Sequence, residues 1–256
     1  MNKINIAIVT SNDNSYASLL LEQAVNIKGN ISVCIINQSK KRSTSRVLKK
    51  TKQIGLLGAL CGLILRKSYK NKFRSLTDVG KAMSLKVIHC KNFYLGEKDQ
   101  KYLSNIDLGI SMGNGYIPPR FYTIFKHGMV NVHHELLPEY PGGQSIIWPI
   151  YFNRRNTGYS IHKISTKIDK GDILIREEYP ISFKKSLFKT IKYNYRNSLL
   201  KSVYGIVNLI NSFDRIYNAP TKNTSDFTLT TPTFGQFLKI LVNHYKIYNA
   251  EKLSSK

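Results

Sequence analysis

Two segments of the chain carry side chains that could do acyl-transfer chemistry. The first is the run Asn131-Val132-His133, and the second holds His162 and Asp169. An amide, an imidazole and a carboxylate can together hold an amine against an acyl carbon and stabilise the oxyanion that forms there. These residue types, delivered from two separated segments, predict an enzyme.

A β-strand is expected to position the first pair. Residues 129–132 are apolar, as expected for a strand that is covered on both faces. If this strand is parallel to its neighbours, Asn131 and His133 lie at its carboxyl end, where open α/β sheets bind ligands. Residues two apart in a strand share a face, so the two side chains point the same way. A lone Asn-x-His occurs in many proteins, so the downstream residues carry the prediction.

The first half of the chain alternates short apolar segments with helix-like ones. This pattern is typical of an α/β fold with a Rossmann-like, mostly parallel sheet. Strands are predicted at residues 4–9, 31–37, 85–90, 108–112 and 129–132. Helices are predicted at residues 15–28, 99–105 and, after Pro118-Pro119, 120–125.

The pattern changes after His133. Residues 157–164 and 172–181 are typical of two strands joined by a turn at residues 169–171, which predicts a hairpin extension of the sheet. Long amphipathic helices are predicted at residues 186–213 and 233–248. We therefore expect a catalytic domain over residues 1–182 and a C-terminal helical appendage over residues 183–256.

The chain is strongly basic. It has 39 Lys and Arg against 15 Asp and Glu, a net charge of +24. Such an excess favours a polyanionic partner, such as a phosphorylated substrate, tRNA or an anionic membrane surface. Lysine is spread over the whole sequence, so composition bias is an equal alternative. Only a cluster of charge on one face would indicate a binding site.

The cysteines and the N-terminus indicate a cytoplasmic protein. Cys34, Cys61 and Cys90 are odd in number and lack metal-binding spacing, so we expect reduced thiols. The apolar run at residues 4–9 is too short for a signal peptide and is typical of a first strand.

Residues 10–15, which follow the first strand, contain no glycine. A glycine-rich phosphate loop would be common at this place in a nucleotide-binding protein. Ser, Asn and Asp are the usual helix caps, and capping is the favoured interpretation. The same hydroxyls and amides could also hold a polar group of a ligand.

The apolar stretch at residues 54–65 has basic residues on both sides. A helix needs about 20 residues to span a bilayer, so this stretch is too short. The favoured interpretation is a buried helix of the sheet layers. One alternative is a lid over the sheet. The other is docking on an anionic membrane surface, which would place the protein at the inner membrane surface.

Several motifs together resemble the folate-dependent formyltransferase family. They are Asn131-Val132-His133, then residues 136–142, residues 157–162 and Ile168-Asp169-Lys170-Gly171-Asp172. The resemblance covers residues 108–181 closely and the first hundred residues only in the order of their elements. The family includes glycinamide ribonucleotide, methionyl-tRNA and sugar N-formyltransferases, and the small enzymes of glycan pathways are the most similar.

The resemblance implies Asn131, His133 and Asp169 as catalytic residues and His162 as a supporting residue. N10-formyltetrahydrofolate would be the formyl donor, and no metal is required. The donor would bind between the loops at residues 113–117 and 164–169. The implied donor-binding residues are Gly113, Asn114, Gly115, Tyr116, Ile117, Ile164, Ser165, Thr166 and Ile168.

Departures from the family pattern narrow the acceptor. His134 and Glu135 stand where most relatives have other residues, and the first loop lacks glycine, so a purine-pathway acceptor is disfavoured. A primary amine of a nucleotide- or lipid-linked amino sugar is the implied acceptor. Alternatives are a methionyl-tRNA formyltransferase-like activity and a non-catalytic binding module that retains the fold. Relatives of the glycan type are often homodimers, which the resemblance also implies here.

Overall fold

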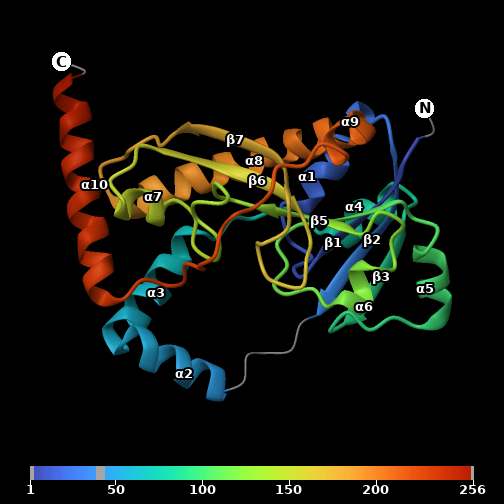
Figure 1. Cartoon of the computed structure of the whole chain (residues 1–256), viewed down its shortest axis with the longest axis horizontal. Coiled ribbons are helices and arrows are strands. Elements are labelled where there is room, and N and C mark those ends of the chain that lie inside the picture. The colour runs from blue at the N-terminus through green and yellow to red at the C-terminus, as the bar shows by residue number, and fades with distance from the viewer. Residues whose placement is uncertain (1–2, 39–43, 255–256) are drawn as a thin grey trace.

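A single seven-stranded sheet organises the chain in the computed structural model, which describes residues 3–38 and 44–254 (Figure 1). The strand order is β3-β2-β1-β4-β5-β6-β7. The strands are β1 (Asn5–Thr10), β2 (Asn30–Gln38), β3 (Lys86–Lys91), β4 (Leu108–Ser111), β5 (Met129–His133), β6 (Asn156–Lys163) and β7 (Ile173–Pro180). The predicted strands are all present, within two residues at either end.

The first five strands are parallel, and β6 and β7 are antiparallel additions at one edge. Strand order reverses between β1 and β4, because β2 and β3 extend the sheet to one side of β1 and β4 to the other. Ligands bind beyond the carboxyl ends of the strands at such a reversal. The predicted mostly parallel sheet with a hairpin extension is confirmed.

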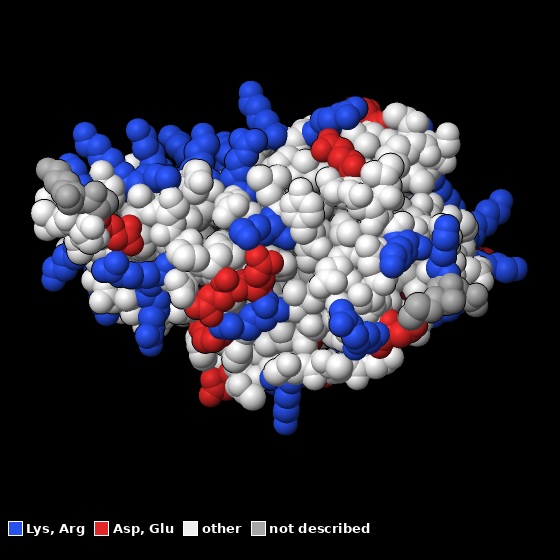
Figure 2. Space-filling view, turned by 90° about the horizontal axis from the view of Figure 1, so that it is seen from above, with Lys and Arg blue, Asp and Glu red and all other residues white. Residues whose placement is uncertain are grey.

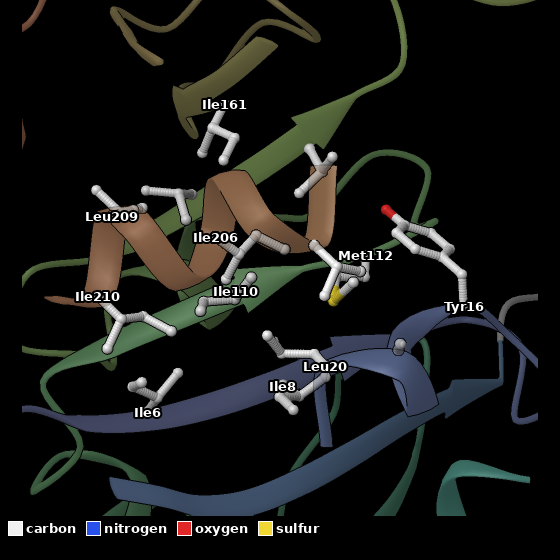
Figure 3. Close-up of a cluster of buried hydrophobic side chains, with 14 of the residues drawn as sticks. Ile6, Ile8, Tyr16, Leu20, Ile110, Met112, Ile161, Ile206, Leu209 and Ile210 are labelled. Carbon is white, nitrogen blue, oxygen red and sulfur yellow. The ribbon is translucent and has the colours of Figure 1, made fainter. Parts of the chain in front are cut away.

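Helices cover both faces of the sheet. One face carries α1 (Ala17–Glu22), α4 (Leu76–Ala82), α8 (Leu187–Asn211) and α9 (Phe213–Tyr217), and the other α5 (Glu97–Leu103) and α6 (Pro119–Tyr122). In Figure 3, Ile206, Leu209 and Ile210 of α8 pack over Ile6 of β1 and Ile110 of β4. Burial of such side chains is the main stabilising term of the sheet layers.

The C-terminal helices do not all stand apart from the sheet. The predicted long helix is α8, and Ser186 caps it by accepting the amide hydrogen of Lys189. Since α8 belongs to the core of the sheet, the first element after residue 183 shares its packing with the strands. The division into domains at residues 182 and 183 stays a prediction.

A second group of helices lies to one side of the sheet (Figure 1). It contains α3 (Leu56–Ser68), α7 (Ile147–Tyr151) and α10 (Phe234–Ser254), which share a core with the start of α8. The favoured interpretation of residues 54–65 is therefore wrong. This stretch packs on α8 and α10 and leaves four of its leucines exposed: Leu56, Leu57, Leu60 and Leu63.

Two smaller predictions also need correction. The helix predicted at residues 15–28 is α1 followed by a 3-10 turn at Ala24–Asn26. The short helices α4 and α7 were not predicted. The three cysteines are free and buried, as expected.

Basic side chains dominate the view in Figure 2, where they gather in a row along the upper left edge and acidic groups are few. Of the helices within residues 3–38 and 44–254, none is both long and apolar enough to cross a membrane.

Candidate functional site

The predicted catalytic pair lies at the carboxyl end of β5, at the place that the sequence indicated. Asn131 is paired with Ser111 of β4 on one side and with His162 of β6 on the other. Met129 belongs to the core beneath one face of the sheet and Val130 to the core beneath the other. The odd-numbered residues of β5 share a face, so Asn131 and His133 point the same way.

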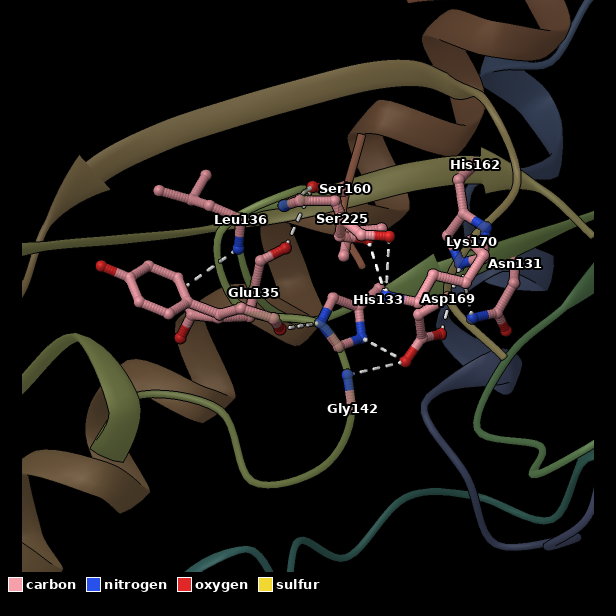
Figure 4. Close-up of polar contacts among 12 residues, drawn as sticks. Asn131, His133, Glu135, Leu136, Gly142, Ser160, His162, Asp169, Lys170 and Ser225 are labelled. Atoms are coloured by element: carbon pink, nitrogen blue, oxygen red, sulfur yellow. Dashed lines mark hydrogen bonds and ion pairs between the residues drawn. The ribbon is translucent and has the colours of Figure 1, made fainter. Parts of the chain in front are cut away.

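Asp169 lies between the two histidines, in the connection from β6 to β7, and its backbone has φ +54° (Figure 4). Its Oδ2 is 3.6 Å from Nδ1 of His133, and its Oδ1 is 3.5 Å from Nε2 of His162. The amide of Gly142 donates a hydrogen bond of 3.0 Å to Oδ2. The structure thus brings together all four residues that the sequence selected as catalytic or supporting.

The hydrogen-bond partners of the two imidazoles show which ring nitrogen of each carries a hydrogen. Nε2 of His133 lies 2.8 Å from the carbonyl oxygen of Tyr140, and Nδ1 of His162 lies 2.9 Å from that of Lys163. A carbonyl oxygen only accepts, so both of these nitrogens carry a hydrogen. Nδ1 of His133 and Nε2 of His162 are the two nitrogens that face the Asp169 carboxylate, and each carries a lone pair when its ring has a single hydrogen.

Only one of these lone pairs is available. Nδ2 of Asn131 lies 3.2 Å from Nε2 of His162 and donates to it, while Oδ1 of Asn131 accepts from the hydroxyl of Ser111 at 2.8 Å. Nδ1 of His133 has no donor among the described residues. One added proton there would turn the 3.6 Å contact with Asp169 into an ion pair, and a small approach of the two groups would make it a charge-assisted hydrogen bond. The site can therefore accept one proton at this nitrogen.

Burial and charge set the ionisation of this pair. Burial lowers the pKa of His133, although Asp169 and the Tyr140 carbonyl act against it. Burial alone would raise the pKa of Asp169, but its neighbours, His133 first and the Gly142 amide among them, outweigh it and hold the pKa below its usual value. At neutral pH the resting site therefore has an ionised Asp169 and a neutral His133.

A cleft opens beside these groups. The side chains of Asn131, His162 and Asp169 line it. Six of the predicted donor-binding residues also line it: Gly115, Tyr116, Ile117, Ile164, Ser165 and Ile168. Lys167, which the sequence did not single out, belongs to the same wall. His133 does not line the cleft and lies behind Asp169, buried to 8% exposure.

Three predicted donor-binding residues lie outside the cleft wall. Gly113 takes φ +79°, a conformation that favours glycine, and Thr166 is exposed. The side chain of Asn114 faces inward: its Nδ2 donates to the Val9 carbonyl, and its Oδ1 accepts from Ser11. Asn114 therefore fastens the loop at residues 113–117 to the end of β1.

The loop at residues 10–15, which follows β1, also has a structural role. Oδ1 of Asp13 accepts the amide hydrogen of Thr77 at 2.8 Å, and Oδ2 accepts the hydroxyl of Ser75 at 2.7 Å. The predicted capping of the helix that follows this loop is wrong for Asp13, because Asp13 bonds instead to the start of α4, which is distant in sequence. The N-cap of α1, Tyr16, makes no side-chain cap hydrogen bond.

The Asp169 turn is supported by a segment that follows α9. Nδ2 of Asn223 donates to the carbonyls of Asp169 and Gly171, and Nζ of Lys170 donates to the carbonyl and hydroxyl of Ser225. A Cβ at Gly171 would lie 1.7 Å from the Lys163 carbonyl, so only glycine fits there. Residues 221–229 thus hold the Asp169 turn in place, a support that no local sequence pattern revealed.

His134 and Glu135 are buried beside the site, with 9% and 2% exposure. Burial lowers the pKa of His134 to about 3, and its Nε2 has no hydrogen-bond partner among the described residues. Burial raises the pKa of Glu135 to about 7. His134 faces Tyr16 and Ser198, on the opposite side of β5 from His133.

Glu135 supports the loop that carries Gly142. Its Oε2 accepts the amide hydrogen of Ile146 at 2.8 Å, and both carboxylate oxygens lie 3.0 Å from the hydroxyl of Thr157. Ile146 has φ +74°, a strained conformation for a β-branched residue. The sequence marked Glu135 only as an unusual residue and gave no sign of this role.

Comparison with known proteins gives a consistent result. Residues 107–196 match the family model described as formyl transferase. The GDP-perosamine N-formyltransferase of Brucella melitensis biotype 1 is 33% identical over 96 residues, which are 37% of this chain and 37% of that protein. The methionyl-tRNA formyltransferase of Koribacter versatilis is 34% identical over 113 residues, 43% of this chain and 36% of that protein. The chain thus spans little more than a third of these curated relatives.

The fold has known counterparts over a greater length. The N-formyltransferase from Helicobacter canadensis, solved with folinic acid and dTDP-3-aminofucose, superposes with a TM-score of 0.56 at 19% identity. The superposition covers 91% of this chain and 72% of that one. The predicted formyltransferase fold is confirmed.

Proposed function

Since residues 107–196 of this chain match the formyl transferase family model, we propose that the protein transfers a formyl group from N10-formyltetrahydrofolate to a primary amine. The observation that carries the proposal is the Asp169 carboxylate, which lines the cleft and contacts both His133 and His162. The donor supplies the formyl carbon. The chain itself must hold the amine, take its proton and stabilise negative charge on the formyl oxygen.

We assign the proton transfer to Asp169 and His133. When the amine nitrogen bonds to the formyl carbon and the bond from that carbon to the folate nitrogen breaks, the amine loses one proton. Asp169 reaches the cleft and can receive this proton directly or through a water. The lone pair on Nδ1 of His133, 3.6 Å behind the carboxylate, can then share it. The proton finally leaves on the folate nitrogen.

Asn131 is proposed to stabilise the oxyanion. One hydrogen on its Nδ2 is given to His162, and the second has no acceptor among the described residues. Because Ser111 and His162 hold both ends of the amide, the orientation of this second hydrogen is fixed before a ligand arrives. His162 is accordingly a positioning residue.

The cleft wall suits a flat, polar heterocycle such as the pterin of folate. Tyr116 and Ile168, each 52% exposed, offer apolar contact, and the loop amides and carbonyls can bond the ring edge. Lys167 at the rim can attract the anionic tail of a folate.

An amino sugar on a nucleotide or lipid carrier is the proposed acceptor. The relative from Brucella melitensis acts on GDP-perosamine, and the Helicobacter canadensis protein was solved with dTDP-3-aminofucose. The net charge of +24 suits the diphosphate of either carrier.

The test measures tetrahydrofolate release from N10-formyltetrahydrofolate with UDP-, dTDP- and GDP-linked amino sugars and with methionyl-tRNA. Turnover with one amino sugar that is lost in Asp169→Asn is the expected result. Turnover with methionyl-tRNA alone would replace the acceptor class. Donor binding without turnover on any acceptor would favour a lipid-linked acceptor, and failure to bind the donor would contradict the proposal.

A further inference from the structure

The helices α2 (Thr44–Ile54) and α3 project from the side of the molecule (Figure 1). They meet at Gly55, which takes φ +77° and so allows the sharp corner between them. Among the described elements, α2 packs mainly against α3, and α3 rests on α8 and α10. The pair is therefore a hairpin with one attached side and one open side.

The open side of α3 carries its largest apolar residues. Leu56, Leu57, Leu60, Leu63 and Ile64 are between 42% and 78% exposed. The attached side carries small residues instead: Gly58, Cys61 and Gly62 are buried there, together with Leu65 and Ser68. A helix that only packed on a protein core would present the opposite arrangement.

Close packing fixes this orientation. A Cβ on Gly62 would lie 2.6 Å from the Cγ2 methyl of Thr231, and one on Gly58 would lie 3.2 Å from the backbone at Phe234. Rotation of the helix to bury its leucines would push their much larger side chains into Thr231 and the backbone at Phe234. Exposure of the leucine face follows from the fold itself.

The apolar surface continues onto α2. Val47 and Leu48 are 52% and 59% exposed. A groove of about 210 Å³ separates the two helices, with Val47, Ile54 and Leu63 among its lining residues. A contiguous exposed apolar surface of this kind marks a contact with a membrane or another macromolecule.

The charges around this surface are all of one sign. Lys49 and Lys52 on α2 and Lys67 on α3 are exposed. The sequence has no Asp or Glu between Glu22 and Asp78. An interfacial helix has this design: lysine and arginine contact anionic headgroups while leucines enter the boundary of the acyl chains.

We propose that the α2–α3 hairpin docks the protein on an anionic lipid bilayer. A second copy of the chain is a poorer occupant, because a symmetric contact would set the lysines of one hairpin against those of the other. Crossing the bilayer is excluded for this hairpin, since α3 has 13 residues and a span needs about 20. The hairpin lies in the plane of the interface, and the part of the protein that carries the Asp169 site stays in water.

Flotation with lipid vesicles tests the proposal on the full chain, without folate or acceptor. The vesicles contain phosphatidylcholine alone, or phosphatidylcholine with about one third phosphatidylglycerol. The test variant is Leu56→Ser, Leu60→Ser, Leu63→Ser. The matched control is Val25→Ser, Met83→Ser, Leu253→Ser, which removes the same number of exposed apolar side chains elsewhere.

The unsubstituted protein and the control should float with the anionic vesicles. The leucine variant should bind at least about ten-fold more weakly. Lys49→Gln, Lys52→Gln, Lys67→Gln should weaken binding, while Lys98→Gln, Lys101→Gln, Lys185→Gln should weaken it less. Equal binding of the leucine variant, equal binding to both lipids, or no binding would overturn the proposal. The proposal would also be overturned if light scattering showed a dimer of the unsubstituted protein and a monomer of the leucine variant.

Membrane docking and formyl transfer can fail separately. The leucine variant should retain the turnover of a water-soluble acceptor in the absence of vesicles, because the substituted residues do not line the cleft. Loss of vesicle binding with retained turnover supports the proposal whatever the acceptor is. Loss of turnover in the leucine variant would instead place the hairpin in the catalytic site and contradict a purely docking role.

Discussion

Asn131 and His162 face each other across the antiparallel pair β5–β6, and the amide of the first donates to Nε2 of the second at 3.2 Å. This bond occupies the one lone pair of His162. It leaves Nδ1 of His133 as the lone pair that can take a proton beside Asp169. The register of two strands thus decides which histidine is available as a base.

Asp169→Asn is expected to lower kcat for formyl transfer by about 100-fold or more, since general-base contributions are of this size. The new amide would donate to Nδ1 of His133 and block the lone pair. The KM for the donor should change little. Steady-state kinetics measures both constants. Asp172→Asn, exposed and three residues further along, is the control and should match the unsubstituted protein; equal kcat in both variants would remove Asp169 from the mechanism.

Gly142→Ala should lower both stability and kcat, whereas Gly143→Ala should change neither. Gly142 takes φ +104°, and a Cβ there would lie 2.1 Å from the Leu229 carbonyl. A Cβ on Gly143 would meet nothing within 4 Å. The cost for Gly142→Ala should be about 1–3 kcal/mol in the free energy of unfolding. Urea denaturation and kinetics check it, and similar behaviour of the two variants would contradict the support given to Asp169.

Glu135 should make the protein less stable as pH rises. Its pKa of about 7 in the folded protein lies above the 4.5 of an ordinary Glu. The folded state therefore binds more protons than the unfolded state between these values, and stability falls as pH rises through this window. The loss attributable to Glu135 from pH 5 to pH 8 should be about 2–3 kcal/mol. Urea denaturation at both pH values should show a smaller change in Glu135→Gln; an unchanged pH dependence would contradict the assignment.

His134 should act in the opposite direction. Its pKa of about 3 in the folded protein lies below the ordinary 6.5. Between these pH values the imidazole is protonated in the unfolded state and neutral in the folded state. Stability is then lost as pH falls from 6.5 toward 3, by about 2 kcal/mol at pH 5. His134→Phe should be less sensitive over this range, as measured by denaturation at pH 7 and pH 5. A variant as acid-sensitive as the unsubstituted protein would mean that His134 is not the responsible group.

Much of the sheet, and the set of residues that the site brings together, could be predicted from the sequence. Strands buried on both faces are continuous apolar runs, and the motif around Asn131, His133 and Asp169 is specific. The two cleft loops followed from the same resemblance, and six of their nine predicted residues line the cleft. These features are local in sequence, which explains why they were accessible.

Features that depend on distant contacts were not predictable. The bond from Asn223 to the Asp169 carbonyl joins residues 54 apart, and no pattern connects them. The orientation of α3 depends on Thr231 in the same way. Glu135 was visible as an unusual residue, but its function depends on the strained Ile146, whose conformation only the tertiary structure determines.

The support of the Asp169 turn by residues 221–229 has a consequence for synthesis of the chain. A ribosome makes all seven strands before it makes Asn223 and Ser225. A nascent chain can therefore complete its sheet while the turn that carries Asp169 still lacks its partners. The site should therefore be completed late during translation, after residues 221–229 have left the exit tunnel and not when Asp169 does.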